Sequence, residues 1–140
     1  MEFSKKGNIS GVYLLRINEG ESVVECIREF LRLHDIKTAS ISLVGAVSWV
    51  DIVTPDVSKK TMPDRQSHID KHMEIIGHGN VVEGEAHIHA AFGEKGGNGH
   101  CGHLVEAEAF VFVEATIQVI DSINVRRVVD DSGFKGLVFD

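Results

Sequence analysis

The sequence predicts an α+β fold: a curved antiparallel sheet or partial barrel of six to eight strands, covered by one main helix. Only residues 22–35 show apolar side chains at helical spacing over several turns. The other apolar segments are rich in β-branched residues and bounded by glycine or polar turns, as strands are. Because these strands follow one another without helical crossovers, antiparallel pairing is favoured. Residues 1–140 fit one domain of ordinary size.

The chain is expected to begin with a strand and then the helix. Residues 11–17, GVYLLRI, contain β-branched and aromatic side chains and predict a strand. Ser22 and Glu25 have the spacing of a capping box, which predicts Ser22 as the N-cap. The helix is expected to end near His34, where a cation is mildly favourable. Cys26 lies within the apolar stripe, so we expect it to pack in the core.

The central segment predicts further strands. Residues 38–54 are too β-branched for a helix and long for one strand, so they form either two strands or one strand bent at Gly45. Residues 55–66 predict a loop. Residues 71–82 predict a strand with a turn at 77–80, where two glycines and an asparagine occur.

The last part of the chain predicts a strand, a loop and several more strands. Residues 83–92 indicate a strand, and residues 93–102 form a glycine-rich loop. This loop lacks the G-x-x-x-x-G-K-[ST] pattern and leads into a strand, so a phosphate-binding loop is not expected. Residues 103–121 indicate one or two strands, and residues 125–131 and 136–139 are short and strand-like.

Composition and charge exclude several classes of protein. The formal net charge is −7, so a basic face for nucleic-acid phosphates is not expected. The small basic clusters, Arg126–Arg127 among them, are interpreted as solvated surface. No apolar run is long enough for a membrane helix, and the N-terminus lacks the pattern of a signal peptide. Two cysteines do not form a disulfide framework, which favours the cytoplasm.

Three histidines have a spacing that suits a metal ion. His87 and His89 are two residues apart on a predicted strand, so both project from the same face. If the glycine-rich loop closes a hairpin, His103 lies roughly opposite His89, with Cβ atoms about 5 Å apart. Three imidazoles can then reach one ion, and they suit Zn²⁺ best, followed by other late first-row divalent metals. Four other histidines, His34, His68, His72 and His78, show no joint spacing. The last three are interpreted as loop or edge residues.

The residues themselves leave alternatives open. The three histidines can equally be polar strand residues that hold no metal. His100 and Cys101 are spare donors, and Cys101 can replace His103 as a ligand. Glu85 shares the histidine face, either as an exposed carboxylate or as a general base. The pattern H-x-H-x(4)-E, which ends at Glu94, is also typical of cupins, although their second motif is absent.

Four segments resemble the plants-and-prokaryotes-conserved (PPC) family over residues 10–120. They are EGESVVECIREFLRLHDIKTASI, LVGAVSWVDI, MEIIGHGNVV and EAHIHAAFGEKGGNGHCGHL. The last is the most specific, because it contains the H-x-H and G-H-L of the family signature, with Cys101 where the family usually has glycine. The resemblance implies an α+β fold with a strongly bent antiparallel sheet, a partial barrel, and assembly as a homotrimer. It also implies a metal, usually zinc, on His87, His89 and His103.

The functional hypotheses follow from these observations. The first is a zinc-containing, trimeric binding or regulatory module with a small-molecule ligand at the metal. The alternative is a zinc-dependent hydrolase or lyase that uses metal-bound water in an open three-histidine site, with Glu85 as base. The DNA-binding label of the family derives from plant members with an R-G-R-P motif. That motif is absent here, and the acidic charge balance argues against direct DNA binding.

Overall fold

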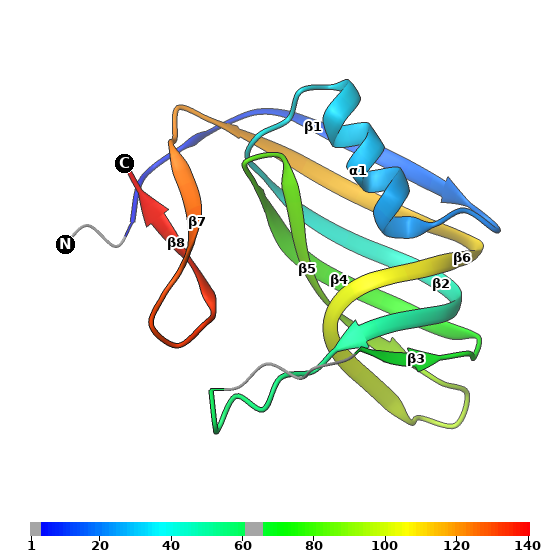
Figure 1. Cartoon of the computed structure of the whole chain (residues 1–140). Helices are drawn as coiled ribbons and strands as arrows, with labels where there is room; N and C mark the ends of the chain where they lie inside the picture. Colours follow the sequence, from blue (N-terminus) through cyan, green and yellow to red (C-terminus); the bar gives the residue numbers. More distant parts are fainter. Residues whose placement is uncertain (1–3, 61–65) are drawn as a thin grey trace.

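The computed structural model describes residues 4–60 and 66–140, which form one helix and eight strands (Figure 1). The helix is α1 (Val23–Leu33). The strands are β1 (Asn8–Asn18), β2 (Ala39–Val53), β3 (Ser67–Ile69), β4 (Met73–Val82), β5 (Glu85–Gly93), β6 (Gly99–Asp121), β7 (Val125–Val129) and β8 (Lys135–Phe139). In this part of the chain, no helix is long and apolar enough to cross a membrane.

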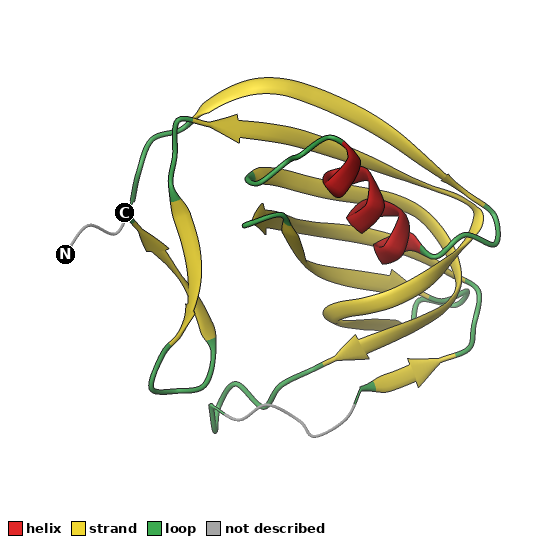
Figure 2. Cartoon of the chain, turned by 45° about the horizontal axis from the view of Figure 1, so that its top comes forward, coloured by secondary structure: helices red, strands yellow, loops and turns green. Residues whose placement is uncertain are grey.

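Six strands form one antiparallel sheet in the order β1-β6-β5-β4-β2-β3. β6 also pairs with β2, so the sheet bends round and partly closes on itself, as Figure 2 shows. β7 and β8 form a separate two-stranded hairpin. The α+β class with a bent antiparallel sheet and one main helix is thereby confirmed.

The long strands bend at positions of unusual backbone geometry. Gly45 has φ +148°, and a Cβ at this position would lie 2.7 Å from the Cα of Val113. The register between β2 and β6 shifts between Gly45 and Val47, so β2 is one strand bent at the glycine rather than two strands. β6 likewise continues as one strand through Val111, whose φ is +64°.

The helix begins where the sequence predicts, but a distant residue supplies the cap. Ser22 is the N-cap in an extended conformation, yet its side chain makes no capping hydrogen bond. Glu106 on β6 accepts hydrogen bonds from the backbone N–H groups of Val24 (2.7 Å) and Glu25 (3.1 Å). The Glu25 side chain pairs instead with Arg28. The predicted capping box is therefore wrong, because a carboxylate from the sheet already satisfies these donors.

The helix packs its apolar stripe on the sheet. Val23, Ile27 and Leu31 are buried in the main core, and burying each contributes about 1.5–3 kcal/mol. Cys26 is partly buried and packs against the same core, in agreement with the sequence interpretation. Burial also raises the pKa of its thiol, with smaller contributions from nearby carboxylates. His34 is the C-cap residue, as expected.

The predicted turn at residues 77–80 is wrong, because β4 runs through them without a break. The chain reverses instead at Glu83 and Gly84, both of which have positive φ. Gly79 has no room for a side chain beside β5, so this glycine permits close strand approach rather than a turn. The predicted loop 55–66 lies partly outside the described residues, and the short strand β3 that follows was not predicted.

Candidate metal centre

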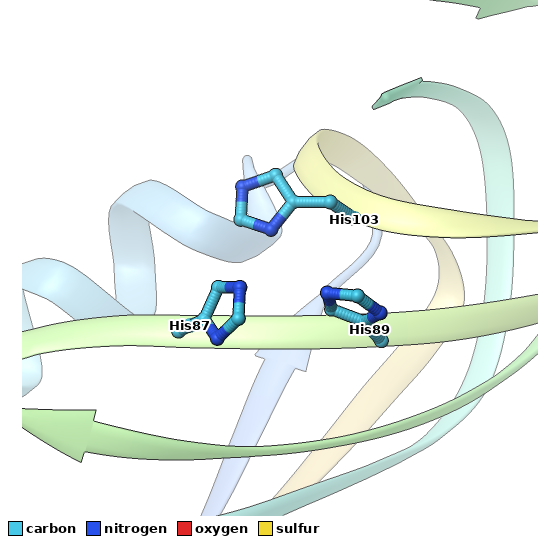
Figure 3. A group of neighbouring side chains, drawn as sticks. All are labelled: His87, His89 and His103. Carbon is cyan, nitrogen blue, oxygen red and sulfur yellow. The ribbon is translucent and has the colours of Figure 1, made fainter. Parts of the chain in front are cut away.

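Three histidine side chains converge on the outer face of the sheet. β5 carries His87 and His89, and β6 carries His103 (Figure 3). The hairpin between these strands pairs His89 directly with His103. The expected hairpin and the expected opposition of residues 89 and 103 are therefore confirmed. The loop predicted at residues 93–102 is shorter, because residues 99–102 already pair with β5 as the start of β6.

The alternation of β5 determines which way the histidines point. Ile88, Ala90 and Phe92 are buried on the inner face of the strand. His87 and His89 alternate with them and therefore project from the outer face. A register slip of one residue would bury the imidazoles and expose the core side chains, so packing fixes the histidine face.

The geometry of the three imidazoles suits a first-row divalent ion. One candidate ligand nitrogen from each ring lies within 4.8 Å of the other two. Ring centroids are 5.0 Å apart for His87 and His89, 5.0 Å for His87 and His103, and 5.7 Å for His89 and His103. Tetrahedral ligands around zinc are about 3.4 Å apart, so modest side-chain rotation closes the difference. Three histidine nitrogen donors form the ligand set of an open zinc site.

Electrostatics keep two of these imidazoles in the ligand form. Burial, followed by the charge of Arg127 and then by His103 and His89, lowers the pKa of His87 to about 4. Burial also lowers the pKa of His103, with contributions from His89 and Arg127. Both rings are therefore neutral near pH 7, which leaves a lone pair for a metal.

A cavity of about 550 Å³ lies in front of the histidines. The β7–β8 hairpin contributes Arg127 and Lys135 to its wall, and Phe134 adds an aromatic surface. Glu85 also lines the cavity and is exposed, so it lies on the histidine face as predicted. The cavity thus combines three histidine nitrogens that can bind a metal with two cationic side chains.

Arg127 was interpreted from the sequence as solvated surface, but it lines this cavity. Its Nη2 donates to Oδ1 of Asn80 (2.6 Å), and its Nη1 donates to the backbone oxygen of Lys135 (3.2 Å). Asn80 pairs in register with His87, so the guanidinium lies beside the histidine group. Arg126, by contrast, is exposed and pairs with Asp140. Side chains alternate between the two faces of a strand, so the adjacent arginines of β7 project from opposite faces. This alternation could have been inferred from the sequence.

The other candidate donors lie outside the group. His100 contacts Glu94 (2.9 Å), which also pairs with Lys71, so the cupin-like interpretation of Glu94 is not supported by its position. Cys101 pairs in register with Ala91. Across residues 4–60 and 66–140, the histidine, cysteine and acidic side chains close enough to share one ion are His87, His89 and His103.

One further histidine does not lie where the sequence suggested. His78 was interpreted as a loop or edge residue, but it lies inside β4 and pairs in register with His89. His68 does lie at an edge, on the short outer strand β3, where its Nδ1 is 2.6 Å from Oδ1 of Asp51. The unpredicted continuity of β4 accounts for the difference at His78.

Solved structures share this fold over almost the whole chain. The metal-containing protein AF0104 from Archaeoglobus fulgidus is 29% identical, with a TM-score of 0.85 over 95% of this chain and 96% of that chain. A Pyrococcus horikoshii plant- and prokaryote-conserved (PPC) protein is 24% identical, with a TM-score of 0.85 over 99% and 97%. A Bacteroides thetaiotaomicron protein described as a "putative dna binding protein" is 21% identical, with a TM-score of 0.80 over 94% of each chain.

The family is established by the sequence profile that the chain matches. A search of curated proteins finds no match. The profile of the Plants and Prokaryotes Conserved (PCC) domain, in contrast, matches residues 4–121, which include α1, six of the strands and all three histidines of the candidate centre. The chain therefore belongs to the Plants and Prokaryotes Conserved domain family.

Proposed function

We propose that this protein is a zinc-containing binding or regulatory module in which His87, His89 and His103 hold the metal. The observation that carries the proposal is the convergence of three nitrogen donors at the wall of a cavity. The similarity to a metal-containing protein of Archaeoglobus fulgidus supports it. Another late first-row metal is the alternative occupant, since imidazole also suits copper, iron and nickel.

The residues around the metal position favour ligand binding over a closed structural site. Three protein ligands leave a coordination position free, whereas structural zinc sites have four protein ligands. That free position would face a cavity of about 550 Å³, within the range of small-molecule sites. We therefore propose that a small molecule binds next to the metal.

A zinc-dependent hydrolase or lyase is the second candidate. The cavity in front of the histidines favours it, because a substrate could reach the metal there. A bound zinc ion would act as a Lewis acid. Glu85 is the carboxylate that the described lining of the cavity offers as a base, and it is exposed. Activity on esters, lactones or phosphoesters that is abolished by a chelator and in Glu85→Gln would favour this candidate.

We also propose that the protein assembles as a homotrimer through the outer face of the sheet. Val12, Leu14, Val44 and Ile76 are large apolar residues with more than half of their surface exposed. Val44 and Ile76 are cross-strand partners, and alternation places Val12 and Leu14 on the same outer face of β1. An apolar surface of this kind is typical of an interaction site. Sedimentation should give a trimer for the wild type and smaller species for Leu14→Asp.

Direct DNA binding is not part of the proposed function. The formal net charge of −7 opposes contact with phosphates, and non-specific DNA binders reach roughly 10⁻⁴–10⁻⁶ M at physiological salt. We expect no mobility shift of duplex DNA at tens of micromolar protein. A salt-dependent shift in that range would contradict this part of the proposal.

Metal analysis of histidine variants tests the proposed function. We expect about one equivalent of zinc per chain in protein purified without chelators, and loss of the metal in His87→Ala, His89→Ala and His103→Ala. His100→Ala is the matched control, because His100 lies on the same hairpin but contacts Glu94. A metal content below about 0.2 equivalents per chain in the wild type would contradict the proposal, and so would an unchanged metal content in the three histidine variants.

A further inference from the structure

The cavity in front of the histidines carries more positive charge than a site for a cation alone requires. Arg127 and Lys135 line it together with the single carboxylate of Glu85 among the described lining residues. The guanidinium of Arg127 lies beside the histidines, because it donates to Asn80, which pairs in register with His87, and it lines the same cavity. A fixed guanidinium next to a divalent ion is unfavourable unless an anion lies between them. The charge distribution therefore indicates an anionic ligand.

Arg127 is held in place by neighbouring groups. Asn80 and the backbone oxygen of Lys135 accept hydrogen bonds from its two terminal nitrogens. Its backbone N–H donates to Glu83 (3.3 Å), and the preceding Val125 is buried. These contacts fix the side chain before a ligand arrives, which lowers the entropic cost of binding.

The guanidinium keeps unused hydrogen-bond donors after these contacts are made. It has five N–H donors, of which the two side-chain hydrogen bonds described above use two. Its Nε is buried and makes no hydrogen bond within the described residues. Partial burial lowers the pKa of the guanidinium, but arginine remains charged in proteins. A partly buried, charged group with free donors favours an oxyanion, which arginine can bind through two parallel hydrogen bonds.

We propose that this cavity binds a small organic oxyanion, a carboxylate or a phosphate, whose charged group contacts Arg127 beside His87, His89 and His103. Lys135 adds a second positive charge at the cavity wall. Val57 and Phe134 supply apolar surface for the organic part of the ligand. The proposal rests on the proposed metal site for part of the positive charge that attracts the anion.

Calorimetric titration of the zinc-loaded full-length protein tests this proposal. Benzoate and phenyl phosphate are the two anionic probes, and benzamide is the neutral control with nearly the same shape as benzoate. We expect at least one of the anions to bind and benzamide not to bind. The anion that binds more tightly identifies the oxyanion as carboxylate or phosphate.

Two neighbouring arginines provide a matched pair of variants. Arg127→Gln removes the charge in the cavity, whereas Arg126→Gln removes an exposed charge that pairs with Asp140 outside it. Arg127→Gln should weaken anion binding on the order of tenfold or more, and Arg126→Gln should leave it unchanged. Arg127→Lys keeps the charge without the fork of donors and should give an intermediate affinity. Circular dichroism and the melting temperature show whether each variant is folded.

Metal content separates failure of this proposal from failure of the proposed function. Each titrated sample is also analysed for zinc, and Arg127→Gln should keep the wild-type zinc content. If neither anion binds wild-type protein that contains zinc, or if Arg127→Gln binds as tightly as Arg126→Gln, the anion proposal is wrong and the metal site stands. If the wild type holds neither zinc nor another late first-row metal, the proposed function is wrong. The titrations are then repeated on metal-free protein. Weaker anion binding that is lost in Arg127→Gln supports the anion site, and binding that is unchanged in Arg127→Gln overturns the anion proposal.

Discussion

Replacing Gly79 with alanine should both destabilise the sheet and disturb the candidate metal centre. Gly79 lies on β4 and pairs in register with Ile88 on β5, between the two histidines of that strand. A Cβ at position 79 would collide with the carbonyl oxygen of His87 and lie 2.8 Å from the Cα of Ile88. Because the obstructing atoms are backbone, no side-chain rotation can make room. The two strands must separate at the histidines.

The size of the effect follows from this collision. Overpacking in a rigid environment costs about 1–3 kcal/mol, and a clash with backbone should fall at the upper end, about 3 kcal/mol. For a chain of this length, that corresponds to a decrease in melting temperature of roughly 10 °C. Gly93→Ala is the matched control on the neighbouring strand, because a Cβ there meets nothing within 4 Å. Urea denaturation followed by circular dichroism measures both variants, and zinc analysis shows whether His87 has moved.

The prediction has a clear contrary result. Gly93→Ala should be neutral or slightly stabilising, since replacing glycine where the backbone permits it reduces the entropy of the unfolded chain. If Gly79→Ala is folded, within about 0.5 kcal/mol of the wild type and unchanged in zinc content, β4 and β5 are not as close at His87 as described. The register that brings the histidines together would then be wrong.

Three further predictions test the core, the helix and the metal. Phe92→Ala should lower the free energy of unfolding by about 3–5 kcal/mol in urea titrations, because Phe92 is buried directly behind the histidine face. Glu106→Gln should cost about 1 kcal/mol and fray the first turn of α1 in hydrogen exchange, because its two carboxylate oxygens cap Val24 and Glu25. Removing zinc with a chelator should lower the melting temperature reversibly, since a metal at 100 times its Kd stabilises the native state by about 2.7 kcal/mol. An unchanged melting temperature would indicate that the native state binds no metal.

Much of the candidate centre could be predicted from local sequence pattern. The spacing of His87 and His89 determines their common face, because side chains alternate along a strand. The short glycine-rich segment then brings His103 opposite His89, since a hairpin keeps neighbouring strands in register. The bent antiparallel sheet followed from β-branched segments without helical crossovers. The organisation of residues 1–140 as one domain, their trimeric assembly and the identity of the metal stay predictions.

The features that the sequence did not predict depend on contacts between distant segments. Arg127 reaches the histidines only because the β7–β8 hairpin folds back beside β4, where Asn80 binds it. Glu106 caps a helix that begins more than 80 residues earlier in the chain. Gly79 looked like a turn residue, but it is needed for close approach of two strands. No local pattern encodes these contacts, because each requires the sheet to be assembled first.

X-ray absorption at the zinc edge of the wild-type protein tests the three-histidine centre most directly. We expect about three nitrogen scatterers at roughly 2.0–2.1 Å, with the multiple scattering of imidazole rings and without sulfur. In His103→Ala, any remaining zinc should show fewer imidazole scatterers. A scatterer at about 2.3 Å would indicate a thiolate ligand such as Cys101, and a shell without imidazole would place the metal elsewhere. Either result would contradict the assignment of His87, His89 and His103 as the ligands.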